Sequence, residues 1–421
     1  MTIALILLFG CYTVLAWRDR VLALGVLLFF LPAYQLRFTF LGIPFTVLEG
    51  MILVCTIVWA VRRWVRGVGR PLAQLPWRWT MLLLALCGVV SVFVAPDRIS
   101  ALGFWKAYLF EPMLIFVVLW DVVRTERQVR WLLAAVAAAS VVLTAIAIEQ
   151  SLGFLPSPEP WLSEVPKRVT SLFAYPNALG LFLAPVVALF TAFALLPSRQ
   201  DRGLARFFPW AVAAFGVLGL ALVVSRGGMV AVAAVIAVLG LVSPYRRWVF
   251  GILGMILALT LLFPPTRAIV VNVVRGTDVS TDVRYVLWQG TARLLLDRPI
   301  VGAGLGGFPV LYDQYRLAQH TELLLYPHNI ILNAWVELGL AGMLLFVWLM
   351  VDAIRRGFRL LKNRLSPFGH QLVYAALAAL LVIIVHGVVD VPYWKNDLAV
   401  QFWFVLSLIP IAGRFGVAGQ K

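Results

Sequence analysis

The sequence has little charge and few residues that could form cross-links. Only 13% of its 421 residues are charged, against about a quarter in ordinary soluble domains. The three cysteines, Cys11, Cys55 and Cys87, all lie inside apolar segments, so neither a disulfide framework nor a cysteine-bound metal is expected. Since 62% of the residues are hydrophobic, a soluble domain could not bury them all, and that class is excluded.

Long apolar segments recur along the whole chain. Each is close to the length of about 20 residues that crosses the hydrocarbon of a bilayer as a helix. We therefore predict an all-α polytopic membrane protein. The first two segments are short and could form a broken or re-entrant pair, which leaves the count at 12 or 13 transmembrane helices. The predicted spans are residues 3–17, 21–35, 47–61, 79–95, 106–123, 131–150, 176–196, 209–224, 229–243, 249–263, 329–351, 372–389 and 398–412.

The net charge of +16 comes mainly from arginine, because only five of the 35 basic residues are lysines. Such a charge on a soluble chain would suggest nucleic acid. Here the arginines concentrate in short loops between apolar segments, which indicates membrane orientation, and no nucleic-acid partner is expected. The preference for arginine over lysine is explained for most positions by codon usage. The basic loops, predicted to be cytoplasmic, are residues 62–70, 124–130, 199–206, 246–247 and 355–364.

The alternate loops then face the periplasm of a bacterial inner membrane, and one of them is long. Residues 264–328 exceed what a connection needs, and such loops are usually functional. We divide the chain into a transmembrane bundle of about ten spans (1–263), this large periplasmic loop (264–328), and C-terminal transmembrane helices with a cytoplasmic tail (329–421). Within the loop, apolar residues at helical spacing between 283 and 294 predict an amphipathic helix, which could lie along the membrane surface.

Several polar residues fall at the periplasmic ends of predicted spans. His328 would lie at a helix start, where the helix dipole favours a neutral imidazole that could accept a proton from a hydroxyl. Arg226 lies in a tight turn of residues 225–228 between two spans, and Arg284 and Arg293 lie on the amphipathic helix. The guanidinium fork matches phosphate oxygens. Each residue also has a structural explanation. His328 could be an interfacial histidine that caps a helix, Arg226 could snorkel outward, and the arginines of the amphipathic helix could lie on its solvated face.

A second group of polar residues lies near the same mouth. Asn177 begins a span and is either a plain helix cap or a hydrogen-bond donor, while Lys167 and Arg168 add positive charge. Tyr326 and Asn329 flank the histidine. The acidic residues of the large loop are dispersed and form no Asp-x-Asp motif, so we expect no metal and no cofactor. Glu337 lies about 13 Å along a helix from His328, which predicts a structural hydrogen bond or ion pair.

Five motifs together resemble a known family. The sequence PHNIIL, followed by ELGLAG, resembles the P-H-N-x-x-L…E-x-G-x-x-G signature of the O-antigen ligase and polymerase superfamily. Three further motifs fit the pattern in the family's order, and the resemblance extends from about residue 170 to 345. The five segments are 327–332 and 337–342 for the signature, then SRG at 225–227, PNALG at 176–180 and GAGLGGF at 302–308.

The resemblance implies a membrane glycosyltransferase of the GT-C kind with a periplasmic active site. Its donor would be an undecaprenyl-diphosphate-linked glycan, and its acceptor a sugar hydroxyl of the lipid A–core, with inversion at the anomeric carbon and no metal. His328 would activate the acceptor, while Arg226 and Arg284 would hold the leaving diphosphate. Asn177, Arg293, Lys167, Arg168, Asn329 and Tyr326 would bind substrate, and the other partners would be membrane lipids.

Other functions stay open at this point. An O-antigen or exopolysaccharide polymerase, or a protein O-oligosaccharyltransferase of the same superfamily, would use the same donor with another acceptor. A transporter for a lipid-linked glycan is a more distant alternative. Transporters carry charged residues at mid-membrane and broken helices in paired positions. Here the polar cluster lies at one surface, which favours an enzyme.

Overall fold

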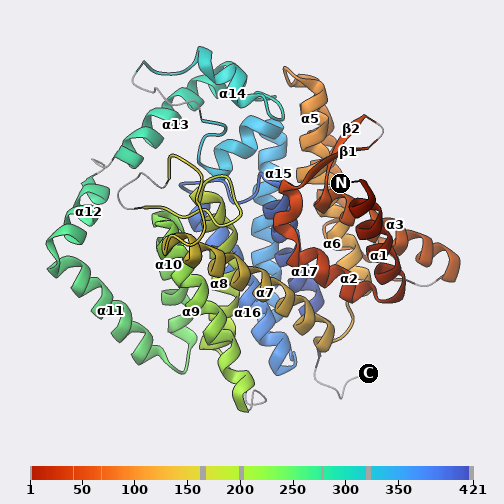
Figure 1. Cartoon of the computed structure of the whole chain (residues 1–421), viewed down its shortest axis with the longest axis horizontal. Coiled ribbons are helices and arrows are strands. Elements are labelled where there is room, and N and C mark those ends of the chain that lie inside the picture. The colour runs from red at the N-terminus through yellow and green to blue at the C-terminus, as the bar shows by residue number, and fades with distance from the viewer. Residues whose placement is uncertain are drawn as a thin grey trace.

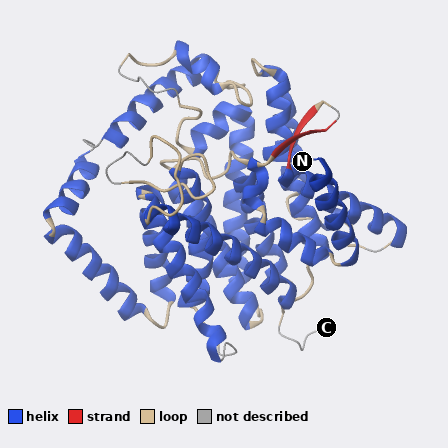
Figure 2. Ribbon diagram, in the orientation of Figure 1, coloured by secondary structure: helices blue, strands red, loops and turns tan. Residues whose placement is uncertain are grey.

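The computed structural model describes residues 2–40, 42–67, 69–161, 167–198, 203–275, 279–318 and 324–416, and it is almost entirely helical (Figure 2). Within these ranges the only paired strands are β1 (Arg37–Phe40) and β2 (Ile43–Thr46), which form an antiparallel hairpin with Arg37 opposite Thr46. The predicted all-α fold is confirmed.

Every predicted apolar segment falls on helix (Figure 1). The first half contains α1 (Thr2–Arg18), α2 (Arg20–Phe29), α3 (Val47–Arg66), α4 (Arg78–Val94), α5 (Arg98–Trp105), α6 (Glu111–Val122), α7 (Glu126–Ser151), α8 (Pro176–Leu195) and α9 (Phe208–Val223). The second half contains α10 (Arg226–Val242), α11 (Arg246–Leu262), α12 (Pro264–Arg275), α13 (Val279–Asp297), α14 (Phe308–Leu311), α15 (Ile330–Leu361), α16 (Pro367–Gly387) and α17 (Asn396–Ala412).

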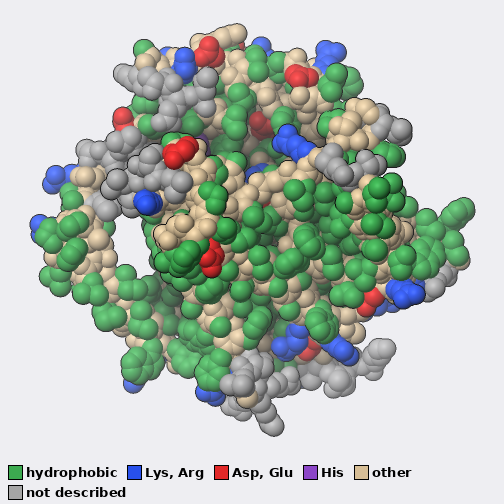
Figure 3. Space-filling view, viewed as in Figure 1, with side chains coloured by type: hydrophobic (Ala, Val, Ile, Leu, Met, Phe, Trp, Pro, Cys, Tyr) green, Lys and Arg blue, Asp and Glu red, His purple; other side chains and the backbone are tan. Residues whose placement is uncertain are grey.

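In the part of the chain that the structure describes, five helical segments are long and apolar enough to cross a membrane, and six if the bent pair of α11 and α12 is counted as one span. Six other described helices are apolar but have only 10–17 residues. Hydrophobic side chains cover much of the middle of the visible surface (Figure 3), as expected for a chain surrounded by lipid. The polytopic membrane character is confirmed, and the count of 12 or 13 spans stays a prediction.

Helix α8 forms the centre of the bundle. Its apolar window is wholly buried, and it packs against α9, α10 and α16. A helix that is apolar on every side can be buried on every side, and α8 has hardly a polar residue between Asn177 and Thr191. This helix therefore fixes where its first residues lie, and Asn177 is one of them.

The large loop builds a cover on one end of the bundle. Helices α11 and α12 meet at 94° and form an arch beside the bundle, which leads to α13 (Figure 1). On α13, Leu287, Gly290, Thr291, Leu294 and Leu295 are buried at helical spacing. This stripe packs on Phe308, Tyr312 and Val336 in a small separate core. The predicted amphipathic helix is thus present, and its apolar side faces protein.

The glycine-rich segment that follows α13 is fitted against a break in α15. Gly339 has φ 71° and ψ 178°, which interrupts the helix, and Leu340 N donates to Ile300 O at 2.9 Å. A Cβ on Gly302 would lie 2.4 Å from the carbonyl oxygen of Val336, so only glycine fits there. Glu337 accepts a hydrogen bond from Gly306 N at 2.7 Å, which confirms the structural role expected for that carboxylate.

Candidate functional site

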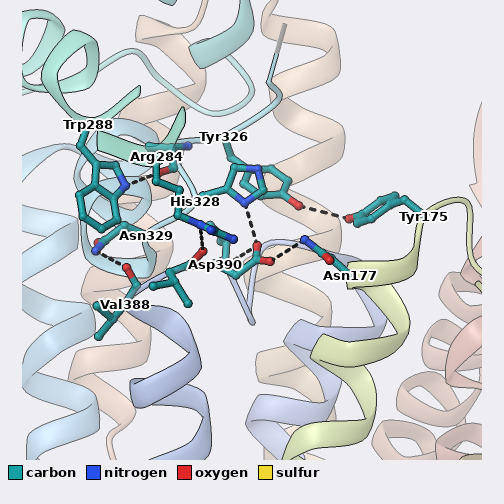
Figure 4. Close-up of polar contacts among 12 residues, drawn as sticks. Tyr175, Asn177, Arg284, Trp288, Tyr326, His328, Asn329, Val388 and Asp390 are labelled. Atoms are coloured by element: carbon teal, nitrogen blue, oxygen red, sulfur yellow. Dashed lines mark hydrogen bonds and ion pairs between the residues drawn. The ribbon is translucent and has the colours of Figure 1, made fainter. Parts of the chain in front are cut away.

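Four helix ends meet at one end of the bundle, beneath α13. Helices α8, α10 and α15 begin there and α16 ends there. The basic loops lie at the opposite end, because α8 and α15 run from this site to Leu196 and to the arginines near residue 359. The structure therefore gathers the motif residues of segments distant in sequence at one place (Figure 4).

His328 and Asp390 form the centre of this group. Nδ1 of His328 lies 3.1 Å from Oδ1 of Asp390. The side chain of His328 is 16% exposed, whereas that of Asp390 is 3% exposed. An ionised carboxylate only accepts hydrogen bonds, so Nδ1 is the donor and Nε2 is left as the basic nitrogen. The pair can orient a histidine base toward a substrate while its acidic partner stays shielded.

The Asp390 carboxylate is held by further donors. Asn177 Nδ2 donates to Oδ2 at 3.3 Å, and the backbone N–H of Val391 donates to Oδ1 at 2.9 Å. Burial alone would raise the pKa of Asp390, but the hydrogen bond from His328 and the charges of His328 and His386 outweigh burial, so this pKa is lowered. The carboxylate is therefore ionised at neutral pH and available to stabilise an imidazolium.

Asn177 is a donor and does not cap its helix. The N-cap of α8 is Tyr175, and Pro176 follows it at the first helical position. The Asn177 side chain instead connects two charged groups, because its Oδ1 accepts from Arg168 at 2.7 Å while its Nδ2 donates to Asp390. The interpretation of Asn177 as a plain helix cap is therefore wrong. Through its hydrogen bond to Asn177, Arg168 also belongs to the group around Asp390.

The loop between α16 and α17 receives donors from α13 and α15. Arg284 donates through Nε to Val389 O at 2.8 Å, and Asn329 donates through Nδ2 to Val388 O at 3.0 Å. The Asn329 side chain also caps α15 by accepting from Ile331 N and Leu332 N. Figure 4 shows both donors beside His328. Arg284 is thereby brought to the histidine from the covering helix.

Aromatic side chains form one wall of the site. The ring of Tyr326 lies 4.6 Å from the imidazole of His328, and its hydroxyl is 3.4 Å from the hydroxyl of Tyr175. Trp288 donates to Pro327 O at 2.9 Å and holds the segment before the histidine. Burial raises the pKa of Tyr326 and raises that of Tyr175 to about 12. Both phenols are neutral near pH 7 and can bond to sugar hydroxyls.

Arg226 is the first residue of α10, at the same end. Ser225 caps this helix by accepting from Gly228 N at 3.3 Å, and the following residue is packed so closely that a Cβ on Gly227 would lie 2.9 Å from Val389. A tight turn joins the two apolar segments, but it lies at Val224 (φ 57°) and Ser225, and residues 226–228, predicted to be in the turn, already belong to α10. Arg226 is exposed at this mouth.

Two predicted substrate-binding residues lie outside the hydrogen-bonded group. Arg293 is exposed on α13, nine positions after Arg284, and Lys167 is exposed just before Arg168. Among the described residues, the hydrogen-bonded group around Asp390 includes neither the Arg293 nor the Lys167 side chain. Within the same ranges, no three His, Cys, Asp or Glu side chains are grouped so as to hold a metal. Metal independence stays a prediction.

Residues outside the motifs contribute to the site or lie close to it. Asp390 belongs to none of the sequence motifs, although its position seven residues before another acid, Asp397, indicates a polar helix end. Two further ion pairs lie in the bundle. Lys395 Nζ is 3.3 Å from Asp397 Oδ2, with both side chains buried, and Lys106 Nζ is 3.4 Å from Glu49 Oε1, with Lys106 partly exposed. The second pair could not be predicted from spacing, because Glu49 belongs to α3 and Lys106 to the turn before α6.

Asp390→Asn is expected to lower the rate of a reaction that uses His328 as its base by about 10²-fold or more, with the protein still folded; for the glycosyltransferase that the sequence resemblance implies, this reaction is transfer of the glycan. One amide oxygen could still accept from His328, but the amide NH₂ would then face the NH₂ of Asn177, and the charge that stabilises an imidazolium would be lost. The readout is the transfer rate of the purified variant. Asp282→Asn, an exposed acid on α13, is the matched control and should transfer at the normal rate.

The pH dependence gives a second check on Asp390. Because the pKa of Asp390 is lower in the folded protein than in the unfolded chain, its ionisation contributes to the free energy of unfolding. This contribution is complete above pH values near the ordinary aspartate pKa of about 3.9, and it is lost as the pH falls through the folded-state pKa. Transfer by the natural protein should therefore show no loss due to Asp390 between roughly pH 5 and 8. Unaltered transfer by Asp390→Asn would exclude the orienting role.

Comparison with known proteins agrees with the geometry. Residues 210–347 match the family described as O-antigen ligase, which confirms the predicted resemblance to that family. The match runs from α9 into α15 and contains Arg226, Arg284 and His328, whereas Asn177 and Asp390 lie outside it. No curated protein matches the chain.

Proposed function

From the match of residues 210–347 to the O-antigen ligase family, we propose that this protein is an inverting glycosyltransferase. It moves an O-antigen glycan from undecaprenyl diphosphate to a sugar hydroxyl of the lipid A–core. The family match supports the O-antigen ligase and polymerase superfamily, whose members are glycosyltransferase-like enzymes. The observation that carries the proposal is the His328–Asp390 pair beside Arg284.

In the proposed reaction, Nε2 of His328 takes the proton of the acceptor hydroxyl. The oxygen forms a bond to the anomeric carbon from the face opposite the diphosphate, and the carbon–oxygen bond to the diphosphate breaks. The diphosphate leaves with the electron pair. Asp390 stabilises the resulting imidazolium. The sugar–diphosphate bond is already activated, so positioning and charge neutralisation provide most of the acceleration.

Arg226 and Arg284 are the proposed ligands of the diphosphate. They come from different elements, α10 and α13. Arg284 donates to Val389 O, and Gly227, the residue after Arg226, packs closely on Val389. Guanidinium groups can bind phosphate oxygens through two parallel hydrogen bonds. Exposed Lys167 and Arg293 are proposed to attract the anionic donor at the outer edge, while Asn177, Arg168, Asn329 and Tyr326 hold the inner wall.

The proposed setting is a bacterial inner membrane with the site on the periplasmic side. The charge distribution supports this orientation, because the basic loops lie at the end opposite His328 and basic loops stay cytoplasmic. The polar residues gather at one end of the bundle, and the helices that lead away from them are apolar. This arrangement suits an enzyme that binds a lipid-linked substrate at the membrane surface. A transporter would have its binding site at mid-membrane.

Separate complementation of a ligase-null and a polymerase-null strain tests the acceptor. We expect the ligase-null strain to regain lipopolysaccharide capped with long glycan, seen as a ladder on a gel, because the acceptor hydroxyl belongs to the lipid A–core. The inactive control is His328→Ala, produced at the same level. Restored chain length on the lipid carrier, with the lipopolysaccharide still uncapped, would instead identify a polymerase and contradict the proposed acceptor.

A further inference from the structure

A basic cavity lies at the end of the molecule opposite His328. It is formed where the last turns of α15 meet the end of α17, and its volume is about 290 Å³, near the lower end of the range of about 300–1,000 Å³ for small-molecule sites. Three arginines provide its polar wall, and aliphatic groups provide the rest. The lining residues are Arg356, Arg359, Leu360, Ile409, Pro410, Gly413 and Arg414. We call this the Arg414 cavity.

The cavity has an excess of positive charge. Among the described residues, the carboxylate that forms ion pairs with these arginines is that of Asp352, which accepts a hydrogen bond from Arg356 and lies 3.6 Å from Arg359. Asp352 also accepts from the indole of Trp77 at 2.8 Å. The carboxylate of Asp121 also acts on Arg414, but Asp121 is itself paired with Arg63. The described side chains therefore leave a net positive charge at the cavity, which can attract an anion.

Arg414 is held in place by its other contacts. Its Nη1 donates to Trp120 O at 2.8 Å and to Val123 O at 3.0 Å, and its guanidinium lies 5.3 Å from the Trp120 ring centroid. Nη2 is buried and finds no hydrogen-bond partner among the described residues. A buried N–H group without a partner is costly. Burial and the charges of Arg70 and Arg124 lower the pKa of Arg414 to about 9.

We propose that the Arg414 cavity binds the phosphate headgroup of an anionic membrane phospholipid. Arg356 and Arg359 supply guanidinium donors that a phosphate accepts, in the fork geometry that lysine lacks, and Arg414 adds its positive charge to the wall of the cavity. Ile409, Pro410 and Leu360 give the start of an acyl chain an apolar wall. The cavity also lies at the ends of two apolar helices, which is the level of lipid headgroups, and basic pockets between membrane helices bind such lipids.

The test is lipid binding to the purified full-length protein in detergent. Phosphatidylglycerol is titrated against it and compared with zwitterionic phosphatidylcholine and with inorganic phosphate. Phosphatidylglycerol should bind at least about tenfold more tightly than either, because its net charge and its acyl chains are both recognised. Equal binding of phosphatidylcholine would overturn the proposal, and so would inorganic phosphate that displaces the lipid at comparable concentration, since the cavity would then be a free-phosphate site.

Variants locate the binding. Arg356→Gln with Arg359→Gln should weaken phosphatidylglycerol binding about tenfold or more. The control is Arg355→Gln, which removes one positive charge from the same helix at a position that does not line the cavity, and it is compared with each of the two single variants as well as with the pair. Arg414→Lys keeps the charge and loses the fork, and it should also weaken binding. The thermal unfolding midpoint of each variant is measured as well, and only variants with an unchanged midpoint are compared for lipid binding. Equal weakening by Arg355→Gln would show a general charge effect and refute the assigned site.

Discussion

His328→Ala is expected to abolish lipopolysaccharide capping in cells and to lower the transfer rate by about 10²–10⁴-fold, the range for loss of a general base. Alanine removes the nitrogen that takes the acceptor proton and leaves the helix intact, because the cap of α15 is made by Asn329. Capping is measured as the ladder on a lipopolysaccharide gel, with the amount of protein in the membrane determined in parallel.

His370→Ala is the matched control for this variant. His370 lies in the first turn of α16, at the opposite end of the bundle from His328, so its loss should leave the ladder unchanged. Normal capping by His328→Ala, at normal protein levels, would show that the imidazole is not the base. Loss of capping by both variants would show a general effect of removing a histidine.

Arg284→Ala is expected to lower the turnover of the donor by about 10²–10³-fold, the cost of removing one donor to a developing negative charge. Its guanidinium also donates to Val389 O, so the alanine variant removes a positioning contact as well. Arg284→Lys separates the two effects, since it keeps a charge near the diphosphate and loses the fork. An intermediate rate for lysine is expected from a phosphate ligand.

The control for the arginine is Arg275→Ala, an exposed position at the end of α12 in the same loop. It should leave both donor binding and turnover unchanged. If Arg284→Ala turned over as fast as the natural protein, the diphosphate would have to be neutralised by other groups, and Arg284 would be only a contact between α13 and the loop after α16.

The helices were predictable because membrane helices follow from length and apolarity alone. A segment such as 176–196 has no other stable conformation inside lipid, and α8 occupies almost the same residues. The grouping of Arg226, Arg284 and His328 at one end also followed from the alternation of basic loops.

The partners of these residues could not be predicted. Asp390 lies 62 residues beyond His328, and their hydrogen bond depends on how α15 and α16 pack side by side. Asn177 had the features of a helix cap, yet the cap is Tyr175 and the amide reaches Asp390. Spacing in a sequence shows which side chains share a helix face, but it carries no information about which helix ends meet.

Single-turnover transfer by purified His328→Ala protein tests the central claim most directly. The assay uses undecaprenyl-diphosphate-linked glycan as donor, with the acceptor that complementation identifies, and donor binding is measured separately. If His328 is the base held by Asp390, the variant binds the donor with normal affinity and transfers it at least about 100-fold more slowly. Transfer within a few-fold of the natural rate would contradict the proposed mechanism.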